Sequence, residues 1–146
     1  MGTLLLLHFI GATIWVGGHL ILSIAVLPNA LKHKDVDAIR NFENKFEKIG
    51  IPALLLQIGT GMYMAYSYLP DFSLWFDFSN PVSKVISYKI ILLAATFLLA
   101  IDARLRIIPK LSKDNLSSLA LHIIPVTLIS LLFVFVGLAF RTGWLY

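Results

Sequence analysis

Cysteine is absent from this chain of 146 residues, and charged residues are scarce. Without thiols the protein forms neither disulfides nor thiolate metal sites. Charged residues make up 14% of the chain, whereas soluble domains carry about 25%. The apolar and polar alternation of barrel strands is also missing. What remains is strongly apolar, because 58% of the residues are hydrophobic and the mean hydropathy is +0.84.

Most of the apolar residues fall in four long runs. Each run is near the ~20 residues that a helix needs to cross a bilayer core of ~30 Å. The runs cover residues 4–27, 49–69, 85–101 and 116–140. The first run is too long for the apolar part of a signal peptide and has no basic leader, so we expect it to be retained. The sequence therefore predicts an all-α integral membrane protein, a four-transmembrane-helix antiparallel bundle that forms one domain over residues 1–146.

Basic residues are concentrated in two of the three connections between these runs. The first connection carries Lys32, Lys34, Arg40, Lys45 and Lys48, and the third carries Arg104, Arg106, Lys110 and Lys113. The second has Asp71 and Asp77 with only Lys84. Short basic loops stay in the cytoplasm, so we expect loops one and three inside and both termini outside, in a bacterial inner (cytoplasmic) membrane. Topology thus explains the net charge of +4, and no nucleic-acid partner is indicated.

Two connections are expected to hold structure of their own. In "KDVDAIRNFENKFEKIG" apolar residues recur at helical spacing. This pattern predicts that the second helix extends into the cytoplasm, with Asp35 or Asp37 as its N-cap. In "LPDFSLWFDFSNP" aromatic residues predict a lid or a short interfacial helix on the outer surface.

The first run, "LLHFIGATIWVGGHLIL", contains two histidines, His8 and His19. Eleven residues at ~100° each make about 1100°, so the two side chains share one helix face and lie ~16 Å apart along the axis. Trp15 lies between them on that face, and Gly11 and Gly18 allow a neighbouring helix or a flat ligand to approach. The two histidines cannot bind one metal ion. They serve two sites at different depths, or each is a structural residue that hydrogen-bonds to another helix.

The inner of these sites pairs His19 with His122. The expected depth of His122 in the fourth run brings it near His19 across the bundle. Two imidazoles on facing helices are the arrangement that holds haem iron, and an apolar lining is offered by Val126, Ile129 and Phe133. We therefore expect His19 and His122 as axial ligands of one haem b. The structural alternative is that His122 is solvated at the cytoplasmic interface.

The outer site combines His8 with residues of two other helices. Lys89 begins the third helix at the depth of His8, where it would hold an anionic group such as a porphyrin propionate or extend to the interface. Met64 shares a helix face with Gln57, Thr60 and Gly61. Histidine and methionine are suitable ligands for Cu(I), so a copper site of His8 and Met64 is the alternative to haem.

The same residues resemble a known membrane family. "LLHFIGATIWVGGHLILSIAVLP", "FEKIGIPALLLQIGTGMYMAY" and "YKIILLAATFLLAIDARLRIIPKL" are similar to the first three helices of the CopD (copper-resistance protein D) family. They also resemble the related HemJ-type protoporphyrinogen oxidases, which bind haem b. In that group a histidine of the first helix and a lysine of the third are important, and they match His8 and Lys89. His19 has no counterpart there, and "LHIIP" with His122 replaces an Asn-Glu-x-Pro motif.

Three functions follow as hypotheses. The first is a haem b-binding membrane protein with an electron-transfer or oxidase role, which would make it a membrane oxidoreductase. The second is copper transport or copper handling, with His8, either Met62 or Met64, and His19 as successive sites. The third is a structural subunit whose histidines only form hydrogen bonds. The expected partners are the lipid bilayer and an electron-transfer protein or a small redox substrate. The small size is also compatible with a homo-oligomer.

Overall fold

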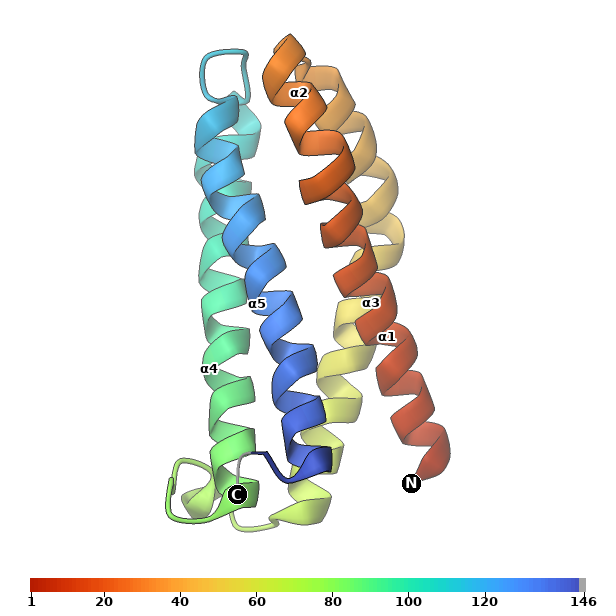
Figure 1. Ribbon diagram of the computed structural model, residues 1–146, viewed down its shortest axis with the longest axis vertical. Coiled ribbons are helices and arrows are strands. Elements are labelled where there is room, and N and C mark those ends of the chain that lie inside the picture. Colours follow the sequence, from red (N-terminus) through yellow and green to blue (C-terminus); the bar gives the residue numbers. More distant parts are fainter. Residues whose placement is uncertain (145–146) are drawn as a thin grey trace.

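The computed structural model describes residues 1–144, and over that range the secondary structure is helical with no strand. Four helical rods run up and down to form a bundle (Figure 1). Their main helices are α1 (Gly2–Ile21), α3 (Val36–Tyr68), α4 (Pro81–Asp102) and α5 (Leu116–Thr142). The rods are 27 to 33 residues long, which exceeds the ~20 residues that span a bilayer core. The predicted all-α four-helix membrane bundle is therefore confirmed.

The first rod is longer than its sequence run suggested. A π-helical turn, Leu22–Val26, joins α1 to α2 (Leu27–His33). The first apolar run was predicted to end at residue 27, but the helix continues through Pro28. The proline has no N–H to donate, and the wider π turn before it relieves the clash of its ring with the preceding turn. The rod ends at Lys34, which has a left-handed backbone with φ 53°.

The second rod is one continuous helix of 33 residues, α3. Asp35 is its N-cap, and the carboxylate oxygen Oδ1 accepts a hydrogen bond of 3.0 Å from the amide of Ala38. This confirms the predicted extension of the second helix and selects Asp35 rather than Asp37 as the cap. The loop between α3 and α4 contains a short 3₁₀ turn, Phe72–Leu74.

The third rod repeats the pattern of the first. Helix α4 passes into a π-helical turn, Ala103–Ile107, and then into a 3₁₀ turn, Ile108–Lys110, that contains Pro109. The fourth rod is α5, which continues through Pro125 and ends at Gly143, where φ is 77°. Glycine adopts this left-handed conformation at little cost, so it terminates the helix cleanly.

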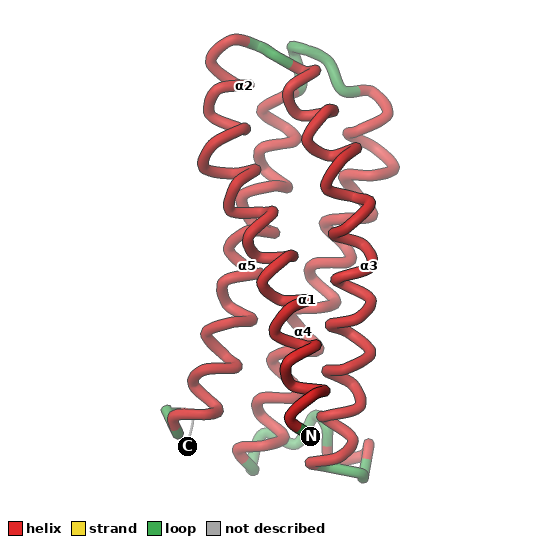
Figure 2. The backbone as a smooth tube through the Cα atoms, turned by 90° about the vertical axis from the view of Figure 1, so that its right-hand side faces the viewer, coloured by secondary structure: helices red, strands yellow, loops and turns green. Residues whose placement is uncertain are grey.

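The helices lie at the corners of a diamond in cross-section (Figures 1 and 2). α1 and α4 run in the same direction at opposite corners, and α3 and α5 return between them. α1 packs on α3 and on α5, and α5 also packs on α4, whereas α3 and α4 make little direct contact. Both chain ends and the loop between α3 and α4 lie at one end of the bundle, and the other two loops lie at the opposite end.

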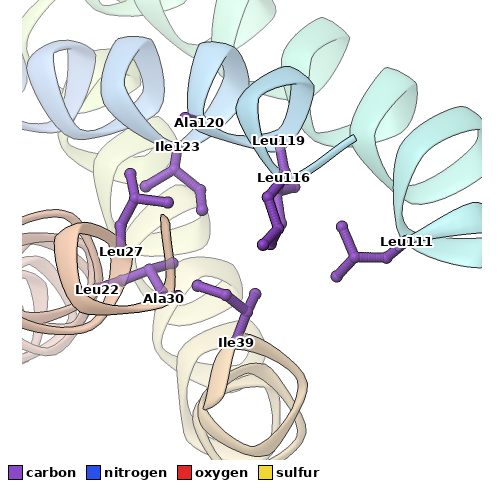
Figure 3. Close-up of a cluster of buried hydrophobic side chains, with 9 residues drawn as sticks. All are labelled: Leu22, Leu27, Ala30, Ile39, Leu111, Leu116, Leu119, Ala120 and Ile123. Carbon is purple, nitrogen blue, oxygen red and sulfur yellow. The ribbon is translucent and has the colours of Figure 1, made fainter. Parts of the chain in front are cut away.

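The main apolar core lies near the end with these two loops (Figure 3). Its members are Leu22, Leu27, Ala30, Ile39, Leu111, Leu116, Leu119, Ala120 and Ile123. Elsewhere the buried side chains include hydroxyl groups, namely those of Thr60, Ser83, Ser87, Thr96, Thr127 and Ser130. Large apolar side chains cover the outer surface, such as Leu98 and Leu121, which are 70% and 71% exposed. A lipid environment is the natural solvent for such a surface.

Candidate functional site

The first part of the site is the close crossing of α1 and α3 at Gly11. A Cβ atom built on this glycine would lie 2.8 Å from the carbonyl oxygen of Ala53 and 3.3 Å from Cβ of Gln57. Only glycine fits here, and its absence of a side chain brings the two backbones together. The crossing fixes where the neighbouring polar side chains of the two helices meet.

His8 lies one turn from this crossing and forms a hydrogen bond with α3. Its Nδ1 is 2.9 Å from Oγ1 of Thr60. The Thr60 hydroxyl donates its own proton to the carbonyl oxygen of Leu56, at 2.6 Å, so toward His8 it acts as the acceptor. Nδ1 of His8 therefore carries the proton, and the lone pair of the neutral ring is on Nε2. The ring N–H is also within hydrogen-bonding reach of the backbone carbonyl of Gln57.

Small residues surround the polar groups of this site. A Cβ atom on Gly61 would lie 3.1 Å from Cε1 of His8, and one on Gly137 would lie 3.6 Å from Nζ of Lys89. Lys89 comes from α4, is only partly exposed, and is close enough for its charge to act on His8. In the described part of the chain it has no hydrogen bond or ion pair. The outer site predicted from His8 and Lys89 thus draws on all four helices.

Gln57 is the unusual member of this group. Its side-chain oxygen Oε1 is buried and has no hydrogen-bond partner among the described residues. A buried acceptor that lacks a donor costs about 1–3 kcal/mol, and such groups are rare in native proteins. Gln57 and Thr60 lie on one face of α3. Oε1 of Gln57 has no hydrogen-bond donor among the described residues.

His19 lies deeper in the bundle, within an aromatic cluster of α1 and α3. Its Nδ1 is 2.9 Å from the carbonyl oxygen of Trp15, so this nitrogen also carries the proton. Its Nε2 has no hydrogen-bond partner among residues 1–144. The ring centroid is 4.3 Å from that of Trp15 and 5.6 Å from that of Phe46. Phe46 occupies the space that a side chain on Gly18 would need.

His122 has different partners from those of His19. Its Nε2 is 2.7 Å from Oδ2 of Asp102 on α4, and its Nδ1 is 2.9 Å from the carbonyl oxygen of Ser118. Thr127, five residues further along α5, is the residue that reaches the backbone of His19, at 3.3 Å. His122 is therefore about 7 Å nearer the loop end than that contact. The structure places the two residues at different depths, and both ring nitrogens of His122 face oxygen atoms of the protein.

Met64 is partly buried on α3, one turn beyond Thr60 toward the outer end. Over residues 1–144 no group of three or more histidine, aspartate or glutamate side chains is arranged to hold a metal ion. A copper site at His8 and Met64 would therefore have to be completed by other ligands. The assignment of Met64 as a copper ligand stays a prediction.

Several residues of these clusters were not singled out by the sequence. Phe46 and Asp102 are two such residues, and the sequence patterns predict no role for either. Gly18 and Gly50 were the sequence signal for the position of Phe46. A side chain at either glycine would occupy the space of the Phe46 ring. The signal for Asp102 was a carboxylate 20 residues from a histidine on the next helix.

No protein-family model, characterised protein or solved structure matches the chain. The likeness to the CopD and HemJ families thus depends on the short motifs of the first three helices.

Proposed function

We propose that this membrane protein binds haem b in the outer half of its bundle and has an electron-transfer or oxidase role. The observation that carries this proposal is the state of His8. Its Nδ1–H is donated to Thr60 across the helix interface, which leaves Nε2 as the free lone pair. Histidines that bind metals almost always donate their other ring N–H in this way, because the bond fixes the tautomer and the ring orientation.

The residues around His8 are compatible with a flat cofactor that carries acidic groups. The His8 imidazole packs against the backbone of Gly61, and the Lys89 ammonium lies beside Gly137. Lys89 has no anionic partner within the described residues, and a half-buried ammonium in a membrane protein needs one. His8 would hold the iron and Lys89 a propionate. Bound haem b would supply an iron centre that gains and loses one electron.

His8 is better placed for this role than the pair of His19 and His122. The His19 ring is enclosed by Trp15 and Phe46, and His122 has both nitrogens engaged. His19 keeps a free Nε2 and remains the candidate for a second position, since His8 and His19 cannot bind one iron. Copper is the second candidate cofactor, favoured by the position of Met64 on the same side of α3 as Thr60.

The orientation in the membrane is part of the proposal. The two loops that share one end of the bundle are the basic ones, so they lie in the cytoplasm under the positive-inside rule. The His8 site then lies in the half of the membrane that faces the outside. In a bacterium this is the periplasmic half of the inner membrane.

The test is an ultraviolet–visible spectrum of the purified protein, oxidised and then reduced with dithionite, with iron and copper measured on the same sample. Haem reconstitution precedes the measurement if the protein purifies without colour. We expect a Soret band that sharpens on reduction and about one haem per chain in the parent. His8→Ala should lose most of this haem.

The matched control is His33→Ala. His33 makes the same kind of Nδ1 contact to the carbonyl of its own helix, 3.1 Å from Asn29, but it is exposed at the loop end. Its replacement should leave the haem content unchanged. Retention of full haem content by His8→Ala would exclude His8 as the ligand. Stoichiometric copper without haem, lost in His8→Ala and Met64→Leu, would replace haem by copper.

A further inference from the structure

An open groove lies along the seam of α4 and α5, on the outer surface of the bundle. It has a volume of about 190 Å³ and is lined by Tyr88, Ile91, Leu92, Leu132 and Val136. Ile91 and Leu132 are 50% and 46% exposed, so the groove opens to the surrounding bilayer. Its volume is below the ~300 Å³ of the smallest sites for drug-sized ligands. A narrow apolar groove of this kind suits a hydrocarbon chain.

The groove lies in the outer part of the hydrocarbon layer. The third apolar run begins at residue 85, and Tyr88 and Leu92 follow on α4. At 1.5 Å per residue these two residues lie ~5 and ~11 Å inside the start of that run. Val136 and Leu132 form the facing wall on α5, which runs antiparallel to α4 (Figure 1). This is the depth at which the first carbon atoms of an acyl chain follow their headgroup.

Lys84 lies one helical turn from Tyr88, toward the outer end of α4. Residues four apart are neighbours on one helix face, so the lysine lies beside the outer end of the groove and just outside the apolar run. Its ammonium has no hydrogen bond or ion pair within residues 1–144. The outer-loop carboxylates of Asp71 and Asp77 accept hydrogen bonds from serines of their own turns instead. Lys84 is therefore available to an anion from outside the protein.

The outer loop holds this part of α4 in place. Ser87 is fully buried, and its hydroxyl donates to the carbonyl oxygen of Trp75 at 2.5 Å. The ring of Phe78 contacts that of Tyr88, with their centroids 5.9 Å apart. These contacts fix the tyrosine ring at the groove before a ligand binds, which lowers the entropic cost of binding.

We propose that Lys84 and the α4–α5 groove bind an anionic phospholipid, with the lipid phosphate at the Lys84 ammonium and one acyl chain in the groove. The order of the two parts matches such a lipid, since the charge lies at the interface and the apolar groove follows directly inside it. Lys84 and Leu92 are ~12 Å apart along the helix axis, so the site accommodates the headgroup and the first part of the chain. Binding does not require haem and is independent of the proposed function.

Native mass spectrometry of the detergent-purified protein, titrated with one lipid at a time, measures the Kd of the first bound lipid. The probes are phosphatidylglycerol and phosphatidylcholine with identical acyl chains. The parent should bind phosphatidylglycerol about fivefold more tightly, which is the effect of one basic residue at an anionic lipid surface. Lys84→Gln should make the two Kd values equal. Lys113→Gln is the control and should keep the preference, because Lys113 is exposed in the loop at the opposite end of the bundle.

The groove is tested by the same substitution at two leucines of α5. Leu132 lines the groove, whereas Leu138 is 51% exposed and points about 200° away from Val136 around the helix axis. Leu132→Trp should fill the groove and weaken the binding of both lipids severalfold. Leu138→Trp should leave both Kd values unchanged.

Three results would each overturn the assignment. They are equal affinities of the parent for the two lipids, a preference that survives Lys84→Gln, and unchanged lipid binding by Leu132→Trp. Thermal unfolding in detergent shows that each variant is folded, and the substituted side chains are all at least partly exposed. Haem content does not enter the comparison, so the failure of this site and the failure of the proposed function are distinguishable.

Discussion

His122 and Asp102 connect α5 to α4 through a hydrogen bond, with Nε2 of the histidine 2.7 Å from Oδ2 of the aspartate. The second ring nitrogen of His122 faces the carbonyl oxygen of Ser118. Both ring nitrogens of His122 are thus engaged by oxygen atoms of the protein. Arg106 contacts the other oxygen of Asp102 at 2.8 Å. These contacts give His122 a structural role at the loop end of the bundle.

Asp102→Asn should lower the melting temperature by a few degrees, because the amide keeps the shape of the carboxylate but not its charge. His122→Asn should have a similar effect, and the double variant should be little worse than either single one, since both remove one interaction. Thermal unfolding in detergent at pH 7 measures all three. Effects that add fully would show that the two side chains act independently.

Gly18 and Gly17 should respond in opposite ways to the same substitution. A Cβ atom on Gly18 would overlap the Phe46 ring, whereas Gly17 has nothing within 4 Å of that position. Gly18→Ala should therefore cost about 1–3 kcal/mol of stability through overpacking. Gly17→Ala should be neutral or stabilising by up to ~1 kcal/mol, because alanine favours the helix.

Phe46→Leu in the Gly18→Ala background tests the cause of this loss. The smaller side chain frees the space that the new methyl group needs, so stability should be partly restored. Thermal unfolding of the parent, Gly17→Ala, Gly18→Ala and the double variant Gly18→Ala/Phe46→Leu measures these differences in stability. If Gly18→Ala melts like Gly17→Ala, then Phe46 does not fill the space beside Gly18.

The outer loop should be insensitive to pH until strongly acidic conditions. The hydroxyl and the amide of Ser73 donate to the Asp71 carboxylate and hold its pKa below the ordinary value, which is about 3.9 for aspartate. A carboxyl whose pKa is lower in the folded state stabilises the fold above its unfolded pKa. This contribution is lost as the pH falls through the folded pKa.

The carboxyl resonance of Asp71, followed by nuclear magnetic resonance, should therefore titrate below pH 3.9. The fluorescence of Trp75, whose indole donates to the carbonyl oxygen of Leu69 at 2.9 Å, should stay constant down to the same pH. Asp71→Asn should remove this transition. A midpoint at or above the ordinary aspartate value would show that the Ser73 contacts do not form in solution.

Orientation can be measured cleanly because the chain has no native cysteine. Ser112→Cys places a thiol in the exposed loop before α5, and Thr142→Cys places one at the opposite end of that helix. In intact cells a membrane-impermeant maleimide should label the cysteine at position 142. The cysteine at position 112 should react only after the membrane is opened. The reverse pattern would invert the proposed orientation and place the His8 site in the cytoplasmic half.

Much of the fold was predictable because hydropathy alone decides which segments enter a bilayer. The four spans follow from this rule, and the extension of α3 follows from helical periodicity with Asp35 as a cap. The continuation of the first helix through Pro28 was not predictable, because it depends on a π turn that leaves no clear mark in the sequence. Local proline rules favour a stop there, and the packing of Leu27 and Ala30 in the core favours continuation.

The site was predictable only in part, and for a physical reason. The position of His8 and Lys89 at one depth follows from the rise per residue of a helix. The direction in which a side chain points around the helix axis does not follow from the rise per residue. His19 and His122 have similar expected depths, yet His19 contacts Phe46 on α3 and His122 contacts Asp102 on α4. The orphaned oxygen of Gln57 likewise depends on how α1 and α3 cross, which only the fold shows.

The π turns of the first and third rods reveal an internal correspondence. Each begins six residues before a proline, at Leu22 before Pro28 and at Ala103 before Pro109. His8 and Lys89 each lie 20 residues before the same two prolines, so they occupy equivalent positions in two helical hairpins that run in the same direction. Each contributes one polar group to the outer site, and neither hairpin contains that site alone.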